Sequence, residues 1–572
     1  MCDMDKQRMI KVAKGIIPAE LVLKNGHIIN VFDGLIEEAD VAIEDGIIVG
    51  IGEYSGVKEI DVKHQFIAPG FIDGHVHIES SMLTPPQFAK IIMPWGTTSI
   101  IADPHEIANV SGIPGIKYMM ESSKTVPLEV FIMIPSCVPV TPFETSGGVI
   151  SARDIESLKN VDHVLGLGEV MDYPGVLAGE TSILDKIAIM KSKTIDGHAP
   201  EVTGKALNAY ASMGIRTDHE CASVEELKER VKRGMYVHLR EGSATRNVRE
   251  LLKGITPNNY SRLLFCTDDK HSEDIRIEGH INFNVNLAIE YGISPIVAIQ
   301  MATINTATCY GIKHLGAIAP SYQADLVVFS DLTKIKPSLV FKKGVLVAKN
   351  SKALFEAKPY QDGDITDSVK VLKRNGMFDL PLTNTKVKVI GLIENNVTTT
   401  KQIETVSVEH GTYVQEDGTD LLKVAVVERH KKSGNVGVGL VKGYGLKGGA
   451  VAMTIAHDSH NLIVVGDSDA DMERAVDEII KISGGIVLVS KGEVLESLPL
   501  EVGGIMTTKD AKFVEAKLNH MEKVMRRMGL NEKIDDPFLS LGFLSLTVIP
   551  ELKLTDQGLF DVTLFKIVPI EE

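Results

Sequence analysis

The sequence is poor in cysteine and has no long apolar run. The five cysteines are Cys2, Cys137, Cys221, Cys266 and Cys309. They are scattered, odd in number and without a CxxC pair, so they favour a reducing compartment over a disulfide framework. No apolar stretch approaches the roughly 18 residues that span a bilayer, and the charged N-terminus lacks the apolar region of a secretory signal. We therefore expect a cytoplasmic protein with no membrane partner.

An excess of basic residues is also missing. The 60 lysines and arginines are outnumbered by 76 aspartates and glutamates, for a net charge of −16. Such a surface argues against a nucleic-acid or anionic-membrane partner. The length of 572 residues exceeds what one hydrophobic core supports, so two or three domains are expected.

Two histidines follow an apolar run in "GFIDGHVHIESS" (70–81). In a β-strand His75 and His77 share one face, because Val76 between them points the other way. Two neutral imidazoles at a strand end can hold a metal ion. Taken alone, the pair could equally be hydrogen-bonded core histidines, so the metal hypothesis needs ligands elsewhere in the chain.

β-rich segments lie on both sides of a long middle region. Residues 20–68 contain apolar runs separated by Asn-Gly and Asp-Gly steps, which are typical of hairpin turns. A similar texture returns at 324–349. We therefore predict one composite β-sandwich domain, formed by residues 1–68 plus 312–365.

The middle region, residues 69–311, alternates short apolar strands with amphipathic helical stretches. Eight strand ends can be recognised, in "GFIDGHVH", "TTSIIADPHE", "EVFIMIPSC", "VLGLGEVMD", "KTIDGHAP", "GIRTDHE", "YVHLREGS" and "LLFCTDDKH". Helical patterns include "SVEELKERVKRG" and "HINFNVNLAIEYG". Eight units over about 240 residues are typical of a (β/α)8 barrel, an α/β fold whose chemistry lies at the C-terminal ends of its strands.

The texture changes after a polar, linker-like run at 355–367. Residues 370–572 combine β-rich runs with the helical stretches "DADMERAVDEIIKI" and "TKDAKFVEAKLNHMEKVMRRMG". We predict that they form a C-terminal α+β domain.

Potential metal ligands lie at five of the predicted strand ends. They are His75 and His77 on the first strand, Glu169 on the fourth, His198 on the fifth, His219 on the sixth and Asp268 on the eighth. Four imidazoles and two carboxylates suit two divalent ions held by mixed nitrogen and oxygen ligands, with one carboxylate between ions about 3.5–4 Å apart. Each histidine alone has an ordinary structural explanation, but six such residues at strand ends favour a binuclear metal site.

These motifs resemble a known family. The stretch "PGFIDGHVH" (69–77), with His198, His219 and "CTDD", resembles the amidohydrolase superfamily. The blocks "HVHIESS", "ADPHEIANV", "GLGEVMDYPGV", "IDGHAP", "TDHE", "HLREGSA" and "FCTDD", with "TIAHDSHN" (454–461), resemble the bacterial adenine deaminases within it. The resemblance extends over nearly the whole chain.

The resemblance carries several implications. It implies a metal-dependent hydrolase barrel with a β-sandwich flank and two divalent ions per subunit (Mn2+, alternatively Fe2+). We also expect a homo-oligomer, a dimer. The resemblance also implies conversion of adenine to hypoxanthine and ammonia in purine salvage. Many superfamily members bridge their metals with a carboxylated lysine, whereas "LGLGEVMD" has Glu169 and no lysine. In the adenine deaminases a glutamate has this role, so a hydantoinase or dihydroorotase is disfavoured.

Deamination at C6 of a purine needs a nucleophile from water and protons for the ring and for the leaving ammonia. A metal-bound water has its pKa lowered towards neutrality. We expect Asp268 to accept and pass on its proton, with Glu169 as the second catalytic carboxylate. Candidates for binding the purine or stabilising the intermediate are His238, Glu241, Ser243, Glu79, Ser80, Asp269, His105 and Glu106. Each could instead be a solvated loop residue or a support for the ligands.

The tail motif "AHDSHN" offers His457, Asp458 and His460. The spacing of its histidines does not match one face of a strand, so we expect a turn. A lid over the barrel mouth, a subunit contact and an extra metal site all fit this motif.

Other interpretations have weaker support. The GxGxxG in "GYGLKGG" (443–449) lacks the strand–turn–helix context of a dinucleotide site. His77 and Glu79 match the H-x-E half of the zinc cytidine-type deaminase signature, but its P-C-x-x-C half is missing. Two rivals remain: another binuclear amidohydrolase acting on a cyclic amide or related aminopurine, and a barrel that has lost catalysis and serves as a scaffold.

Overall fold

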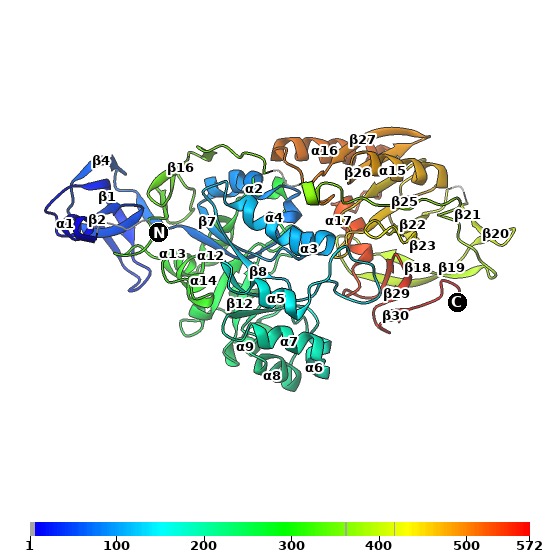
Figure 1. Cartoon of the computed structure of the whole chain (residues 1–572), viewed down its shortest axis with the longest axis horizontal. Coiled ribbons are helices and arrows are strands. Elements are labelled where there is room, and N and C mark those ends of the chain that lie inside the picture. Colours follow the sequence, from blue (N-terminus) through cyan, green and yellow to red (C-terminus); the bar gives the residue numbers. More distant parts are fainter. Residues whose placement is uncertain (1–5, 361–362, 417) are drawn as a thin grey trace.

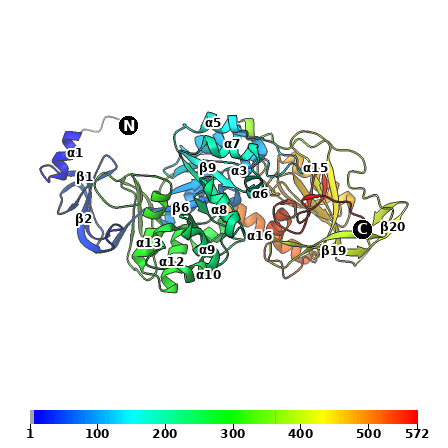
Figure 2. The ribbon, with the colours of Figure 1, turned by 90° about the horizontal axis from the view of Figure 1, so that it is seen from below.

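Eight parallel strands lie at the centre of the molecule, between a β-sheet at one end and a C-terminal lobe at the other (Figures 1 and 2). The computed structural model describes residues 6–360, 363–416 and 418–572. The central strands are β6 (Phe71–Val76), β7 (Thr97–Ala102), β8 (Glu129–Ile134), β9 (Val164–Val170), β10 (Thr194–Gly197), β11 (Thr217–Asp218), β12 (Tyr236–Arg240) and β13 (Leu263–Cys266).

The eight strands form two parallel sheets that meet at both seams. Strands β6 to β10 make one sheet and β11 to β13 the other, each in chain order. At one seam the backbone N–H of Asp268 donates to His75 (2.9 Å). At the other seam Arg216 donates to Ile195 (2.9 Å). The predicted barrel strands are therefore present, in the predicted order.

Helices follow the strands and cover the outside of the barrel (Figure 1). They are α2 (Pro85–Ile92), α3 (His105–Ser111), α4 (Ile113–Ser123), α5 (Ala152–Leu158), α6 (Tyr173–Ala178), α7 (Thr181–Ile189), α8 (Gly204–Ser212), α9 (Val224–Lys232), α10 (Val248–Leu251), α11 (Ser272–Glu278), α12 (Ile281–Tyr291), α13 (Pro295–Met301) and α14 (Ile304–Cys309). Short 3-10 turns cover Ile78–Ser81, Met93–Trp95, Leu252–Gly254, Tyr260–Arg262, Gly363–Ile365 and Phe543–Ser545.

Local sequence explains both element types. Every residue of β6, β7 and β8 is buried, as expected for parallel strands covered on both faces, so these strands show no alternation. Helix α9 begins at a capping box, in which Ser223 accepts from the N–H of Glu226 and the Glu226 carboxylate accepts from the N–H of Ser223. The helical patterns predicted at α9 and α12 are confirmed.

One nine-stranded sheet combines early and late residues of the chain. Its strands are β1 (Ala19–Ile29), β2 (Ile36–Glu44), β3 (Ile47–Gly52), β4 (Gly56–Asp61), β5 (Phe66–Pro69), β14 (Leu326–Phe329), β15 (Leu339–Lys342), β16 (Val345–Lys349) and β17 (Lys352–Ala353). The two segments join where β5 pairs with β14 in antiparallel register. Helix α1 (Lys6–Ala13) packs on this sheet.

One predicted hairpin is a bulge instead. Asp45 and Gly46 form the expected two-residue turn between β2 and β3, both with positive φ. Asn25 and Gly26, in contrast, lie inside β1, where the register shifts. Strand β1 changes its parallel partner there, from β4 to β5. The prediction of a turn was wrong because the same dipeptide also provides the positive φ of a bulge.

The C-terminal lobe has an eight-stranded sheet with helices packed on it. Its strands are β18 (Lys386–Leu392), β19 (Thr399–Thr405), β22 (Leu421–Val427), β23 (Val436–Lys442), β24 (Ala450–Met453), β25 (Leu462–Gly466), β26 (Gly485–Ser490) and β27 (Glu493–Pro499). Smaller pieces are β20 (Ser407–Glu409), β21 (Thr412–Val414), β28 (Leu552–Thr555), β29 (Gly558–Asp561), β30 (Lys566–Ile567) and α17 (Pro537–Gly542). The two predicted helices are α15 (Asp469–Lys481) and α16 (Ala511–Arg527).

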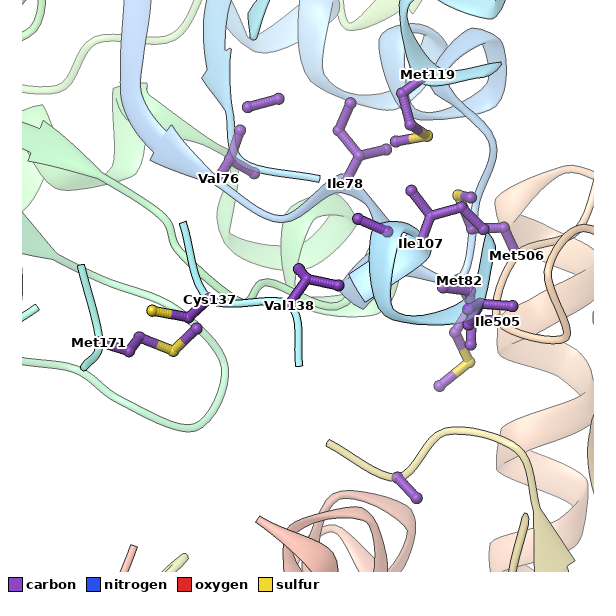
Figure 3. Packing of buried hydrophobic residues seen from close by; sticks show 14 of the residues in the cluster. Val76, Ile78, Met82, Ile107, Met119, Cys137, Val138, Met171, Ile505 and Met506 are labelled. Carbon is purple, nitrogen blue, oxygen red and sulfur yellow. The ribbon is translucent and has the colours of Figure 1, made fainter. Parts of the chain in front are cut away.

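The C-terminal lobe packs against the barrel just beyond the end of β6. The backbone N–H of Thr507 donates to Met82 (2.9 Å), and that of Thr84 donates back to Thr507 (3.2 Å). Ile505 lies beside Met82 and Ile107 in one apolar cluster (Figure 3). Within the described residues, no helix has the length and apolar character needed to cross a membrane.

Candidate metal centre

The six predicted ligands converge at the C-terminal ends of the barrel strands. The Nε2 atoms of His75 and His77 are 3.2 Å apart. They lie 3.4 and 3.1 Å from Oδ1 of Asp268, which follows β13. Beyond β10 and β11, Nδ1 of His198 and Nε2 of His219 are 3.4 Å apart. Two groups of ligand atoms thus face one another across the barrel mouth.

Glu169, at the end of β9, connects the two groups. Its Oε1 lies 3.3 Å from Nε2 of His77, while its Oε2 lies 2.9 Å from Nδ1 of His198 and 3.2 Å from Nε2 of His219. Each carboxylate oxygen therefore serves a different group of imidazoles. This is the arrangement that a carboxylate between two ions requires.

The donor set fits divalent transition metals. Three overlapping groups of three residues each bring their ligand atoms within 4.8 Å of one another: His75, His77 and Glu169; His75, His219 and Asp268; Glu169, His198 and His219. Imidazole and carboxylate ligands suit manganese, iron and zinc, whereas an all-oxygen set would suit calcium or magnesium. The residues present therefore fit a pair of such ions.

The two carboxylate ligands are in the form that binds a cation. Burial opposes the charged form of Glu169, but hydrogen bonds from His105, His198 and His219 hold the pKa of this carboxyl well below its usual range. Burial likewise opposes charge on Asp268, yet the positive charge of Arg240 keeps its pKa well below the usual range. Ionised carboxylates are the form that binds metal.

A charged pair that the sequence reasoning missed holds this arrangement in place. Arg240, the last residue of β12, donates from Nη1 to Oδ2 of Asp268 (2.7 Å) and from Nη2 to Glu220 (3.1 Å). Glu220 lies 3.5 Å from His219 and 3.6 Å from His198. Arg240 thus binds one oxygen of Asp268 and leaves the other facing the histidines. Its position in "HLREGS" at a strand end was the available signal.

Asp103, after β7, is a second support that was not predicted. Its Oδ2 accepts the backbone N–H of Glu169 (2.9 Å). Its backbone carbonyl lies 2.8 Å from Nδ1 of His77, so this ring nitrogen donates and Nε2 stays free for a ligand. One residue therefore orients two of the six ligands.

A cavity lies beside the cluster, between the barrel mouth and the C-terminal lobe. It is lined by Glu79, Ser80, Met82, Glu106, Asp269, His271, Met453, Ile455, His457, His460, Ile505, Leu518, Asp536, Phe538, Leu539 and Gly542. Four of the predicted substrate-binding residues, Glu79, Ser80, Glu106 and Asp269, are among them. The Ser80 hydroxyl donates to Asp269, which lies at a loop turn rather than on a continuing strand.

His105 connects this cavity with the ligand cluster. It is the first residue of α3, and its Nδ1 lies 3.2 Å from Oε1 of Glu169. Its Nε2 lies 3.6 Å from Oε1 of Glu106, a residue that lines the cavity. The cavity and the ligand cluster are therefore one imidazole apart.

The other substrate-binding candidates lie away from the cavity. His238 is fully buried within the barrel, its ring centroid 6.3 Å from that of His75, and neither of its ring nitrogens has a hydrogen-bond partner among the described residues. The Ser243 hydroxyl donates to Asp274, and Glu241 is buried 3.8 Å from Arg246.

The tail motif reaches the barrel mouth. Residues 454–461 connect β24 to β25, so the predicted turn is confirmed. Nδ1 of His457 lies 2.8 Å from Oε1 of Glu106, and Nε2 of His460 contacts the other oxygen of the same carboxylate. Asp458 is buried between them in the chain, with Oδ2 unpartnered within the described residues. Sequence reasoning found these residues but not their partner, which lies in a different domain.

Comparison with known proteins places the chain. Residues 66–347 match the amidohydrolase family, and residues 396–566 match the adenine deaminase C-terminal domain. The chain is 48% identical over 563 residues to "Adenine deaminase 2" of Carboxydothermus hydrogenoformans, covering 98% of this chain and 99% of that one. It is 47% identical over 565 residues to "Adenine deaminase" of Clostridium acetobutylicum, covering 98% and 99%.

Solved structures match part of the chain. The β-aspartyl dipeptidase of Fervidobacterium islandicum AW-1 aligns with 59% of this chain and 98% of its own, at 16% identity and a TM-score of 0.46. The relatives described above match at nearly three times that identity and from end to end. On that basis the chain belongs to the adenine deaminase family.

Proposed function

We propose that this protein deaminates adenine hydrolytically to hypoxanthine and ammonia, in purine salvage. One observation carries the proposal: a glutamate lies between two groups of metal ligands, immediately beside a small cavity closed by the C-terminal lobe. The cavity has apolar walls that carry carboxylates and imidazoles, which suit the polar edge of a flat heterocycle. Its free volume is about 40 Å³, so a purine enters only when the lining side chains move.

Two divalent ions per subunit would be held by His75, His77, Glu169, His198, His219 and Asp268. Manganese is the metal we propose first, and ferrous iron is the alternative. Bound there, the ions would supply a hydroxide nucleophile at neutral pH.

Asp268 is the proposed proton carrier. Its Oδ1 faces the ligand cluster and accepts the proton of the attacking water, because Oδ2 is bound by Arg240. It then gives this proton to the purine ring, and the second proton of the water passes to the amino group, so that the C–N bond at C6 breaks and ammonia leaves as the C6 carbonyl forms. Glu169 stays ionised throughout and keeps the two ligand groups together.

The substrate would lie in the cavity, with its reacting carbon towards His105 and its far edge towards the C-terminal lobe. Glu79 and Asp269 are acceptors for purine N–H groups, and Glu106 acts with the tail histidines His457 and His460. Ser243 supports this region from outside the cavity by donating its backbone N–H to the carbonyl of Asp269 (2.7 Å). A role for His238 and Glu241 in binding the substrate stays a prediction.

The domain division that we propose has three parts. Residues 1–68 plus 312–365 would make the β-sandwich domain, of which residues 1–5 and 361–362 lie outside the described residues. The strands of this part pair in one nine-stranded sheet, on which an apolar cluster lies. Residues 69–311 are the (β/α)8 catalytic barrel, and residues 370–572 are the C-terminal domain. A homodimer and a cytoplasmic location stay predictions from the sequence.

Ammonia release tests the proposal directly. Purified protein, stripped of metal and refilled with manganese, should convert adenine to hypoxanthine, with adenosine as the control substrate. Glu169→Gln and Asp268→Asn should abolish the reaction. A refilled protein that binds two metals but leaves adenine unchanged contradicts the substrate, and a panel of hydantoins and other aminopurines would then identify the cyclic amide or aminopurine that replaces it.

A further inference from the structure

The Glu106 carboxylate binds two histidines of the C-terminal lobe, and the two rings are held in different ways. Glu106 belongs to α3 and is only 2% exposed. His457 and His460 lie 351 and 354 positions further along the chain. Each of the two carboxylate oxygens meets one ring. This contact therefore links the barrel mouth to the tail turn, together with the hydrogen bond from Asn461 to the carbonyl of Thr145 (2.8 Å).

Both ring nitrogens of His460 have protein partners. The backbone N–H of Ala456 points at its Nδ1 (3.2 Å), so this nitrogen accepts and carries no proton. Nε2 must then carry the proton of a neutral ring and donate it to Glu106. Burial lowers the pKa of His460 to about 3, in agreement with a neutral ring.

The same three side chains could surround a cation, since their ligand atoms lie within 4.8 Å of one another. A metal bound at Nε2 of His460 would need the proton to move to Nδ1, where it would face the N–H of Ala456. Two N–H groups cannot share one hydrogen bond. The backbone geometry therefore favours a hydrogen-bonded network over a metal site.

His457 has one ring nitrogen, Nε2, that is not used in the contact with Glu106. Its Nδ1 donates to Glu106, which leaves Nε2 as the nitrogen available to a ligand. The ring stacks on Phe543, with centroids 4.6 Å apart and planes tilted by 28°, and it lines the cavity. Burial opposes a charge on this ring, but the facing carboxylate of Glu106 raises its pKa to about 9.

We propose that Nε2–H of His457 donates a hydrogen bond to a ring nitrogen of the bound purine, and that Glu106 is the positioning residue for this contact. The inference rests on the proposed function, because it assumes a purine in the cavity. It assigns part of substrate recognition to the C-terminal domain. Adenine has three nitrogens that can accept such a bond, N1, N3 and N7, and the contact involves one of them.

Binding of purines that are not hydrolysed tests the contact independently of turnover. Dissociation constants of 1-deaza-, 3-deaza- and 7-deazaadenine are measured by equilibrium dialysis on manganese-loaded wild type and His457→Ala. Wild type should bind one analogue about 10–100-fold more weakly than the other two, the size of a charge-assisted hydrogen bond. His457→Ala should bind that analogue as wild type does and lose the same factor for the other two.

Two results would overturn the contact. If His457→Ala weakens all three analogues equally, the ring only shapes the cavity. If it weakens none, the ring does not touch the purine. A wild type that binds purines in this pattern without releasing ammonia would contradict the deamination and leave the contact supported, so the two failures are distinguishable.

Glu106 is tested through its effect on His457. Glu106→Gln keeps the size of the side chain but offers one ring an N–H instead of an oxygen, and should weaken binding of the same two analogues. In the His457→Ala background it should add nothing, since groups that act as one unit are not additive. Fully additive losses would show that Glu106 acts on the substrate by another route.

The chain provides a matched control. His520 on α16 also pairs through Nδ1 with a glutamate, Glu496 (2.7 Å), but its side chain is 56% exposed and lies outside the cavity. His520→Ala should leave all dissociation constants unchanged. Metal content per subunit should be equal in wild type, His457→Ala and His520→Ala. If His457→Ala alone loses one metal ion per subunit, then Glu106, His457 and His460 form a cation site and not a hydrogen-bonded network.

Discussion

The two ends of the barrel both bury charged residues, but only one end pairs them completely. At the N-terminal end, Lys342 of β15 donates to Glu129 and to Asp325, both at 2.7 Å, and Gln323 donates to Glu129 at 2.8 Å. All four side chains are buried. The composite sheet thus attaches to the barrel through a closed polar network.

At the C-terminal end, several buried carboxylates have one oxygen without a hydrogen-bond partner among the described residues. Oε2 of Glu79, Oε2 of Glu144 and Oδ2 of Asp458 have no hydrogen-bond partner within the described part of the chain. Unpaired buried acceptors are costly and rare in folded proteins. Their concentration at the end where barrel enzymes bind their substrates indicates a site built for ligands, whereas the N-terminal end is built for attachment.

Asp268→Asn should show the largest effect on chemistry. Losing the proposed proton carrier should lower kcat by about 10²–10⁴-fold, and the free energy of unfolding should also fall, because the buried Arg240 loses its charged partner and the metal site loses a ligand. Steady-state ammonia release and a urea titration check this. Near-wild-type activity would show that another group at the same end of the barrel carries the proton.

Lys342→Met should lower the stability of the protein and leave its catalysis unchanged. It leaves Asp325 buried without its cation and Glu129 with only His163 (3.5 Å) and Lys343 (4.0 Å), so the free energy of unfolding should fall by about 3–5 kcal/mol. The kcat/KM of the remaining folded protein should be unchanged, because the network lies at the other end of the strands. Adding Glu129→Gln to this variant should recover part of the loss; a drop in kcat/KM would contradict the separation of the two ends.

Metal removal should lower the Tm through the ligands at the C-terminal end of the barrel and should not depend on the network at the N-terminal end. Ions that bind only the folded state stabilise it by about 2.7 kcal/mol at a hundred times their dissociation constant, so chelation should lower Tm by several degrees. Glu169→Gln should make Tm insensitive to manganese, whereas Lys342→Met should keep the full response. Equal responses in the two variants would contradict the assignment of the ligands.

Glu144→Gln should produce the smallest and most pH-dependent change. Burial, with Asp458 nearby, raises the pKa of Glu144 to about 8 from an ordinary value of 4.5. The folded state then holds a proton that the unfolded state has released, so stability falls as pH rises from about 5 to 8. The variant should flatten this decline, which urea unfolding at pH 5, 6.5 and 8 would measure. An unchanged slope would show that Glu144 is ionised when folded.

The ligand cluster could be predicted because its rules are local. A residue that follows a short apolar strand lies at a strand end, and in a parallel barrel all such ends meet. His75, Glu169 and Asp268 follow that rule. Arg240 also follows it, but an arginine at a strand end is as often solvated, and its contact with Glu220 depends on how two strands are staggered.

Contacts between residues that are far apart in the sequence could not be predicted from such local rules. The contact of Glu106 with His457 depends on how two lobes pack, and nothing local to either segment specifies it. The bulge at Asn25 failed for a related reason, since the dipeptide favours positive φ but does not say whether the chain reverses there. The partner strands β4 and β5 decide that.

The pairing of β5 with β14 has a consequence for synthesis. These strands are neighbours in one sheet, yet the whole barrel separates them in the chain. At about 5–20 residues per second, the ribosome delivers β14 roughly ten to fifty seconds after β5. During that time the first half of the sheet has an open edge, which the nascent barrel or a chaperone must protect from pairing with another chain. Strands β14 to β17 complete this sheet. The sheet can therefore be completed only after the whole barrel has been synthesised.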